Sequence, residues 1–309
     1  MYFRDLVESE EQWQNYEKLL SELAGFARDC VQFLIDASAV AQIASVQDRC
    51  YSHSTVLMLT RHVIESVDGV SVLVERGCAE NCGPLLRSAF EAQLGLLYIL
   101  DTDSKRRALS YQVAHAHRKI KAYRKCDPND PLGKQLRAEL KDDPMAEVFN
   151  QVPGDLQVMI ANLEGMFNKP EYAPIEAEWQ ASRKNKVPEW FALFGGPRDI
   201  RSLAIQLKLG AVYEGLYRSW SDVIHAGSGF NHVGRSDQPG TIMIRPIRHP
   251  DGLESACTFA AEFCLNTART LVQKYDSAQW ERFRQTYSEK ISPHYMEISK
   301  GTLIKAQWR

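Results

Sequence analysis

The sequence predicts an all-α protein. Apolar residues recur every three or four positions along most of the chain, whereas the strict alternation of a half-buried strand is almost absent. An apolar fraction of 44% and a charged fraction of 25% are ordinary for a globular protein. We therefore expect an antiparallel helical bundle with a proline-rich irregular helical insertion and a glycine-rich loop before the last long helices.

Four helical stretches open the chain. They cover residues 9–46, 52–76, 84–101 and 105–127. Gly77 follows the second stretch and suits a helix C-terminus, because glycine adopts the left-handed conformation that ends many helices. Pro84 suits the first turn of the third, where no backbone N–H is needed. The links are short, so we expect these four helices to be neighbours in the bundle.

The remainder of the chain is less regular. Eight of the thirteen prolines lie in residues 127–197, which predicts short helices broken by turns. Helical periodicity returns in residues 199–224, 252–275 and 277–289, and the glycine-rich residues 227–251 between them hold one short extended piece. We divide the chain into an N-terminal helical segment (1–50), core helices (51–127), an insertion (128–198), C-terminal core helices (199–291) and a tail (292–309).

Charge and cysteine usage favour a cytoplasmic protein. The net charge of −2 gives no general attraction to nucleic acid or anionic lipid. The acidic N-terminus and the lack of a long uncharged apolar run predict neither a signal peptide nor a membrane helix. The seven cysteines are an odd number, which favours reduced thiols. No second Cys or His pair completes a zinc site with Cys78 and Cys82, so we predict no metal and no cofactor.

The strongest functional signal is the end of the stretch 199–224. A helix advances about 100° per residue, which predicts Arg218, Ser221, Asp222 and His225 on one face. Arginine can hold a phosphate, and an imidazole can transfer protons near neutral pH. Two structural explanations compete with this hypothesis: the helix dipole favours a histidine in the last turn, and Asp222 can pair with Arg218.

A second candidate lies in the most apolar helix. Arg87 and Glu91 are four residues apart there, and charges in such surroundings are usually paired or part of a site. Arg87 therefore either forms an internal pair with Glu91 or reaches the face of Arg218 and His225 as a second phosphate ligand.

The stretch 105–127 contains a basic stripe that includes Arg118 and Lys121. It could follow an RNA backbone, but such a stripe is more often a solvated face or pairs with an acidic helix. Tyr213, Tyr217 and Trp220 could stack on bases, although aromatic residues at this spacing usually belong to the core.

The segments 86–92 and 221–225 resemble a bacterial family of uncharacterised, all-helical proteins, for which no reaction is assigned. A more distant similarity is to the HEPN superfamily, whose ribonucleases carry an Arg and a His separated by four to six residues; Arg218 and His225 are separated by six. Ser219 follows the arginine where that superfamily often has Asn, Asp or His. This resemblance implies metal-independent RNA cleavage at a site formed across a homodimer.

Our leading hypothesis is thus an RNA-cleaving effector of anti-phage defence or a toxin–antitoxin system, with RNA, a second copy and a protein antitoxin as partners. The alternative is a non-enzymatic sensor or scaffold that binds a nucleotide, an anion or a protein near the glycine-rich loop. A third reading is a metal-dependent hydrolase that uses Asp222 and His225, with Glu65 or Glu91 as further ligands.

Overall fold

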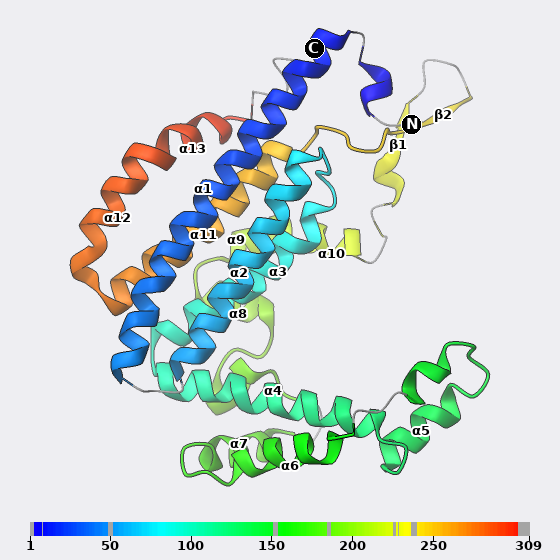
Figure 1. Cartoon of the computed structure of the whole chain (residues 1–309), viewed down its shortest axis with the longest axis vertical. Coiled ribbons are helices and arrows are strands. Elements are labelled where there is room, and N and C mark those ends of the chain that lie inside the picture. Colours follow the sequence, from blue (N-terminus) through cyan, green and yellow to red (C-terminus); the bar gives the residue numbers. More distant parts are fainter. Residues whose placement is uncertain are drawn as a thin grey trace. The chain divides into compact units, whose positions relative to one another are not determined.

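The computed structural model describes residues 3–7, 9–48, 52–150, 154–183, 187–224, 227, 229–235 and 240–301. These residues are mostly helical, and the sheet among them has two short strands, β1 (Val233–Arg235) and β2 (Ile242–Ile244). The all-α fold class is therefore confirmed (Figure 1). Contacts divide the chain into unit 1 (Met1–Thr102 and Ile200–Arg309) and unit 2 (Asp103–Asp199).

Four long helices make the centre of unit 1: α1 (Glu10–Asp48), α2 (Ser52–Glu75), α3 (Cys82–Asp101) and α11 (Leu253–Tyr275). They pack against one another: α1 and α3 each contact both α2 and α11, and α2 and α11 also contact each other (Figure 1). The smaller elements of unit 1 are η1 (Phe3–Leu6), α8 (Ile200–Gln206), α9 (Gly210–Val212), η4 (Tyr213–Tyr217), α10 (Arg218–Ile224), η5 (Gly229–His232), η6 (Ser277–Gln279), α12 (Trp280–Thr286), η7 (Tyr287–Ile291) and α13 (Ser292–Ile298).

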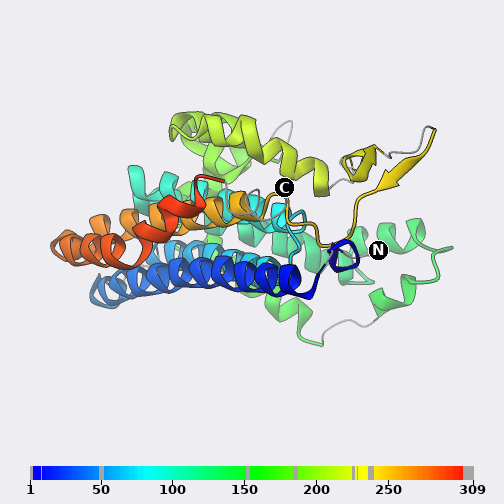
Figure 2. The same cartoon turned by 90° about the horizontal axis from the view of Figure 1, so that it is seen from above.

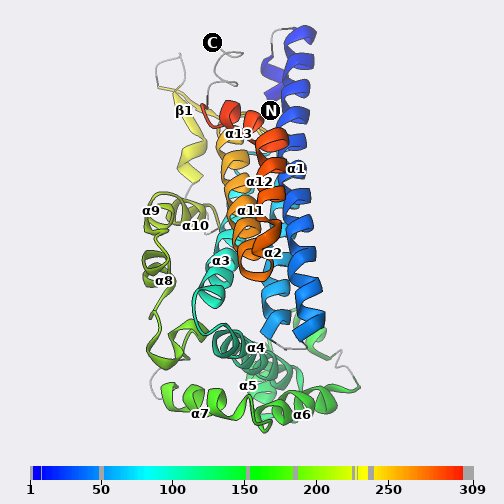
Figure 3. The same ribbon diagram turned by 90° about the vertical axis from the view of Figure 1, so that its left-hand side faces the viewer.

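The smaller helices cover two sides of this core. The α8–α10 segment packs on α3, on the opposite side of the core from α1 (Figure 2). The C-terminal helices α12 and α13 lie beside α11 (Figure 3). Helix α13 begins at Ser292, where we had placed the start of a tail, and its Ile298 is buried.

Burial of apolar side chains explains the packing of α1. Leu19, Leu23 and Leu34 recur at helical spacing and are almost completely buried between α1 and its neighbours. Each such side chain contributes about 1.5–3 kcal/mol on leaving water. A window within Glu10–Val46 is also long and apolar enough to cross a membrane, and 39% of it is buried. Its buried residues pack on α2 and α11, as those of a core helix do.

The end of α2 confirms the prediction for Gly77. Its φ of +70° is left-handed, its N–H donates to the carbonyl of Val74, and the N–H of Cys78 donates to that of Leu73. These two bonds form a Schellman motif, which satisfies carbonyls that the helix end would leave unpaired.

Unit 2 is built on α4 (Ser104–Cys126), with α5 (Pro131–Glu139), η2 (Ala146–Asn150), α6 (Leu156–Phe167), α7 (Ala173–Ser182) and η3 (Trp190–Gly195). The short helices agree with the proline content. We had expected α4 to be the fourth bundle helix, but the contacts group it with unit 2 and α11 packs on α1 instead. The reason is that α6, α7 and η3 cover the apolar stripe of α4, whose Leu109, Val113 and Ile120 are buried.

The expected single helix over residues 199–224 is interrupted twice. Lys208 has a left-handed φ of +61°, which ends α8. The π-helical turn η4 then joins α9 to α10. The extended piece expected within residues 241–246 is β2, which pairs antiparallel with β1.

Candidate functional site

The π-helical turn η4 directly precedes the predicted motif. A π turn widens the helix by one residue and often occurs at functional sites. It presents Tyr217 to α3, where the ring is 7% exposed and lies 6.1 Å from that of Phe90. One turn later, Trp220 is also buried and packs edge-on against Phe263. Tyr217 and Trp220 are therefore core residues and are not available to stack on bases.

Arg87 lies at the centre of a hydrogen-bond network between α3 and α10. Its Nε donates to Glu91 Oε1 (3.0 Å), its Nη2 to the Tyr217 hydroxyl (2.9 Å) and its Nη1 to Ser221 Oγ (2.9 Å). The Tyr217 hydroxyl donates in turn to Glu91 Oε1 (2.7 Å), and the guanidinium lies 4.6 Å from the centre of the Tyr217 ring. Arg87 thus both pairs with Glu91 and reaches the helix of the motif.

Electrostatics keep Tyr217 and Arg87 each in one protonation state near neutral pH. Burial and the hydrogen bond to Glu91 raise the pKa of Tyr217. Partial burial alone would lower the pKa of Arg87, but the hydrogen bond and charge of Glu91 and the contact with Tyr217 raise it overall. Neither group therefore titrates near neutral pH. The network holds α10 on α3, and Tyr217 and Arg87 are not suited to proton transfer at that pH.

Arg218 lies outside this network. Its side chain is 72% exposed and pairs with Glu214 (3.4 Å), one turn earlier. Arg201 on α8 pairs with the same carboxylate. The pKa of Glu214 is lowered, first by the hydrogen bond from Arg201 and then by the charges of Arg201 and Arg218. We call Arg201, Glu214 and Arg218 the arginine cluster.

The predicted face of the motif is thus divided. Ser221 points towards α3, whereas Arg218 points to solvent. Residues three apart on a helix differ by about 60° around its axis, which is enough to bury one and expose the other. His225 and the side chain of Asp222 lie outside the described residues, so their part of the prediction stays a prediction.

The basic stripe lies on the exposed side of α4 in unit 2. Arg118 and Lys121 are exposed, and none of the carboxylates that the structure describes pairs with either. Arg124, on the same helix, pairs with Glu164 of α6 at 2.6 Å. Burial, Lys119 and Arg118 lower the pKa of His115. Within unit 2, Arg118 and Lys121 are therefore available to meet an anion, whereas Arg124 is neutralised by Glu164.

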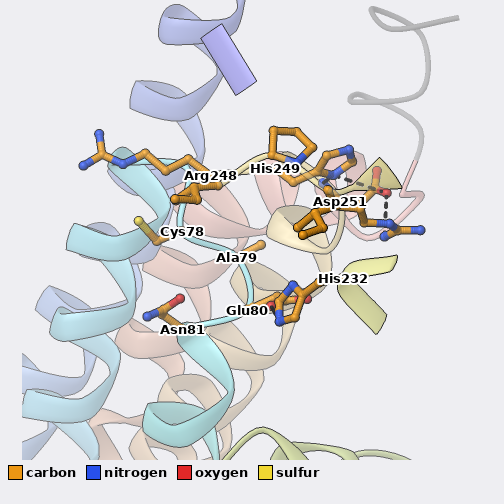
Figure 4. Close-up of a pocket in the computed structure, with 12 residues that line it drawn as sticks. Cys78, Ala79, Glu80, Asn81, His232, Arg248, His249 and Asp251 are labelled. Atoms are coloured by element: carbon orange, nitrogen blue, oxygen red, sulfur yellow. Dashed lines mark hydrogen bonds and ion pairs between the residues drawn. The ribbon is translucent and has the colours of Figure 1, made fainter. Parts of the chain in front are cut away.

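Sequence reasoning missed a pocket of about 310 Å³ in unit 1 (Figure 4). It is formed by the turn before α3, by η5 and by the segment after β2. The lining residues are Cys78, Ala79, Glu80, Asn81, His232, Ile244, Arg245, Pro246, Ile247, Arg248, His249 and Asp251. The signal that could have revealed it is the charged run from Arg245 to Asp251, which contains two prolines and lies within the glycine-rich segment.

The residues that the structure describes offer no set of side chains that could bind a metal ion. No group of three or more His, Cys, Asp or Glu side chains lies close enough there to hold an ion. The six described cysteines are free thiols. Burial and the nearby Cys78 raise the pKa of Cys82 to about 12, which keeps that thiol protonated and unreactive at neutral pH.

Comparison with known proteins places most of these features in one family. A family described as of unknown function, DUF5677, matches residues 53–241, more than half of the chain. That range includes Arg87, Glu91, the arginine cluster and His225, and it includes α4. No curated protein and no solved structure matches the chain. The chain therefore belongs to the DUF5677 family of helical proteins of unknown function.

Proposed function

We propose that the protein binds RNA at the arginine cluster and cleaves it without a metal ion, as a HEPN-like effector. The observation that carries this proposal is the convergence of Arg201 and Arg218 on the single Glu214 carboxylate at an exposed surface. Two guanidinium groups around one carboxylate leave a net positive charge. A phosphate can join such a cluster through charge-assisted, bidentate hydrogen bonds.

The chemistry follows from where the motif lies on α10. Arg218 begins that helix, and His225 follows its last residue in the sequence. In the proposed reaction His225 accepts the proton of a ribose 2′-hydroxyl, whose oxygen attacks the adjacent phosphorus. The bond from phosphorus to the 5′-oxygen breaks, the leaving oxygen takes a proton from solvent water, and His225 returns its proton to solvent. Arg218 stabilises the negative charge that develops on the phosphate oxygens. The products are a 2′,3′-cyclic phosphate and a 5′-hydroxyl.

The network around Arg87 has a positioning role in this proposal. By binding Tyr217 and Ser221, Arg87 and Glu91 fix the rotation of α10 about its axis. That rotation turns Arg218 to solvent. Within unit 2, the exposed Arg118 and Lys121 of α4 are a separate candidate for contacts to an RNA backbone. Such contacts carry no sequence information and weaken as salt increases.

The test is incubation of the full chain with labelled total RNA in EDTA. We expect wild-type cleavage, and a loss of at least about 100-fold in Arg218→Ala and His225→Ala, the usual effect of removing a charge stabiliser or a general base. Arg61→Ala is the matched control, because Arg61 is 71% exposed and pairs with Glu65 at the same i,i+4 spacing. That variant should cleave as the wild type does.

Two outcomes contradict the catalytic proposal. Equal cleavage by wild type and His225→Ala would assign the activity elsewhere. RNA binding that Arg218→Ala weakens, with no cleavage by the wild type, would instead favour the non-enzymatic binding module. In that case Arg87, Arg218 and His225 serve binding without turnover.

We extend the proposal to a cytoplasmic homodimer that acts in anti-phage defence or as a toxin restrained by a protein antitoxin. A toxic ribonuclease needs such restraint while the cell is healthy. Sedimentation of the purified chain tests the dimer, and growth of cells that express wild type or His225→Ala tests the toxicity. A monomer would remove the dimeric site from the proposal.

A further inference from the structure

We propose that the pocket between the turn before α3 and the segment after β2 binds a small organic oxyanion, a carboxylate or a phosphate monoester attached to an apolar group. This site shares no residue with the arginine cluster, and the proposal does not depend on RNA cleavage. The argument rests on the backbone, the charges and the apolar residues of the pocket.

The pocket walls are held in an unusual backbone conformation. Arg248 has a left-handed φ of +63°, which costs a non-glycine residue free energy and persists only where packing enforces it. Gly77 lies against it: a Cβ on Gly77 would meet the Arg248 carbonyl at 3.5 Å and the Tyr16 hydroxyl at 2.9 Å. Strained residues of this kind concentrate at binding sites, where they fix the shape of a wall.

The charged side chains of the pocket offer more hydrogen-bond donors than acceptors. Glu80 accepts from the ring of His232 (3.2 Å), and Asp251 lies 3.3 Å from His249 Nδ1 (Figure 4). Each carboxylate thus lies beside a histidine. The Arg245 guanidinium lies 3.8 Å from Asp251, too far for a hydrogen bond, and it donates no side-chain hydrogen bond to the residues that the structure describes. Its five N–H groups are suited to the two oxygens of an oxyanion.

The apolar part of the pocket defines the rest of the ligand. Ala79, Ile244, Pro246 and Ile247 line it, and the Ile244 and Ile247 side chains are more than half exposed. Covering them gains about 25 cal/mol per Å² of apolar surface. The volume of about 310 Å³ is at the lower end of small-molecule sites, which suits a single ring or a short chain rather than a polymer.

His249 makes the site sensitive to pH. The backbone N–H of Asp251 donates to His249 Nδ1 (3.2 Å), an arrangement that requires the neutral ring. Burial lowers the pKa of His249, Arg245 lowers it further, and Asp251 and Glu80 oppose this effect. The other titratable or charged groups of the pocket are His232, Arg248 and Cys78. When the ring is protonated, Nδ1 donates to Asp251 instead, and the added charge attracts the oxyanion.

Calorimetric titration of the full chain with phenyl phosphate and with benzoate tests the proposal. We expect saturable binding of at least one probe, and the tighter probe identifies the oxyanion as a phosphate monoester or a carboxylate. Arg245→Gln should weaken binding by about tenfold or more, since it removes a bidentate charged contact. Arg245→Lys should bind with intermediate affinity, because lysine keeps the positive charge but cannot form the two parallel hydrogen bonds of a guanidinium.

Arg28→Gln is the matched control. Arg28 is about as exposed as Arg245, pairs with Glu75 at a similarly long 3.5 Å, and lies outside the pocket. It should bind both probes as the wild type does. Benzoate keeps its charge down to about pH 5.5, so its affinity should increase as the pH falls below about 6.5, where His249, whose pKa is lowered, gains its proton.

Three results would overturn the proposal. The first is binding of both probes weaker than about 10 mM, which is too weak for a formed site. The second is unchanged binding in Arg245→Gln. The third is an equal loss of binding in Arg245→Gln and Arg28→Gln, which would show a general charge effect.

Discussion

Tyr217 connects two side chains of α3 with one of α10, through its hydroxyl and its backbone carbonyl. It donates to Glu91 and accepts from Arg87 on α3, while its own backbone carbonyl accepts from Ser221 on α10. The sequence predicted the Arg87–Glu91 pair from its spacing. It did not reveal Tyr217 as their common partner, because that contact depends on the rotation of α10, which the π turn sets.

Tyr217→Phe should lower the free energy of unfolding of unit 1 by about 1–2 kcal/mol. The substitution keeps the ring but removes hydrogen bonds with two charged groups, which are worth more than neutral ones. Urea unfolding followed by circular dichroism measures the change. Tyr213→Phe is the control, because Tyr213 stacks on Tyr217 at 4.8 Å and its hydroxyl makes no hydrogen bond to the described residues. An equal loss in both variants would contradict the role of the network.

The same pair of proteins gives a pH test of the Tyr217 prediction. The pKa of Tyr217 is raised in the folded state by burial and by Glu91, so the unfolded chain releases its proton first as pH rises. The stabilisation is complete below the unfolded pKa of about 10 and decreases above it. The difference in stability between wild type and Tyr217→Phe should therefore shrink above about pH 10. The other buried tyrosines and cysteines are present in both proteins, so their contributions to the pH dependence cancel in the difference in stability.

At the scale of elements, α5 is fixed against the end of α4 by a glycine. A Cβ on Gly133 would lie 1.7 Å from the backbone carbonyl of Asp127, so the first turn of α5 touches the backbone that follows α4. Arg137 reinforces the junction by donating to the carbonyls of Cys126 and Phe149. The contact has no sequence signature beyond a glycine inside a short helix.

Gly133→Ala should destabilise unit 2 by roughly 3 kcal/mol or more, at the upper end of overpacking effects, since the backbone itself must move. Hydrogen exchange of the α4 and α5 amides measures the effect. Gly165→Ala in α6 is the control: no atom lies within 4 Å of its added Cβ, and alanine favours a helix. We expect that variant to gain up to about 1 kcal/mol. If these amides were equally protected from exchange in both variants, detaching α5 from α4 would cost little free energy.

Helix ends were easier to predict than helix partners. Gly77 marks the end of α2 because its chemistry is local, and Asp127 follows the last residue of α4 for the same reason. The apolar stripe of α4 shows that one face is buried, but any apolar surface of matching length can cover it. The partners of α4 are the short helices of unit 2. The fourth long helix that packs with α1, α2 and α3 is α11, for which we had expected α4.

At the scale of the whole molecule, the candidate sites lie where the sequence pattern is weakest. The arginine cluster is formed by α8, before the break at Lys208, and by η4 and the start of α10 after it. The pocket is formed by two loops with left-handed residues. Helical periodicity carries no information about such loops, since their conformation is set by packing against distant segments. Arg218 was predicted as a site residue, whereas Arg201, Glu214 and Arg245 were not.

The division into two units predicts two unfolding transitions. Each unit has its own core, with α1, α2, α3 and α11 in one and α4, α6, α7 and η3 in the other. In urea, Tyr217→Phe should lower the unfolding midpoint of unit 1 alone. Gly133→Ala should lower the unfolding midpoint of unit 2 alone. The matched controls Tyr213→Phe and Gly165→Ala give the reference for each shift. Hydrogen exchange under the same conditions assigns each transition to its amides. One shared transition, moved by both substitutions, would mean that the units unfold together as a single cooperative structure.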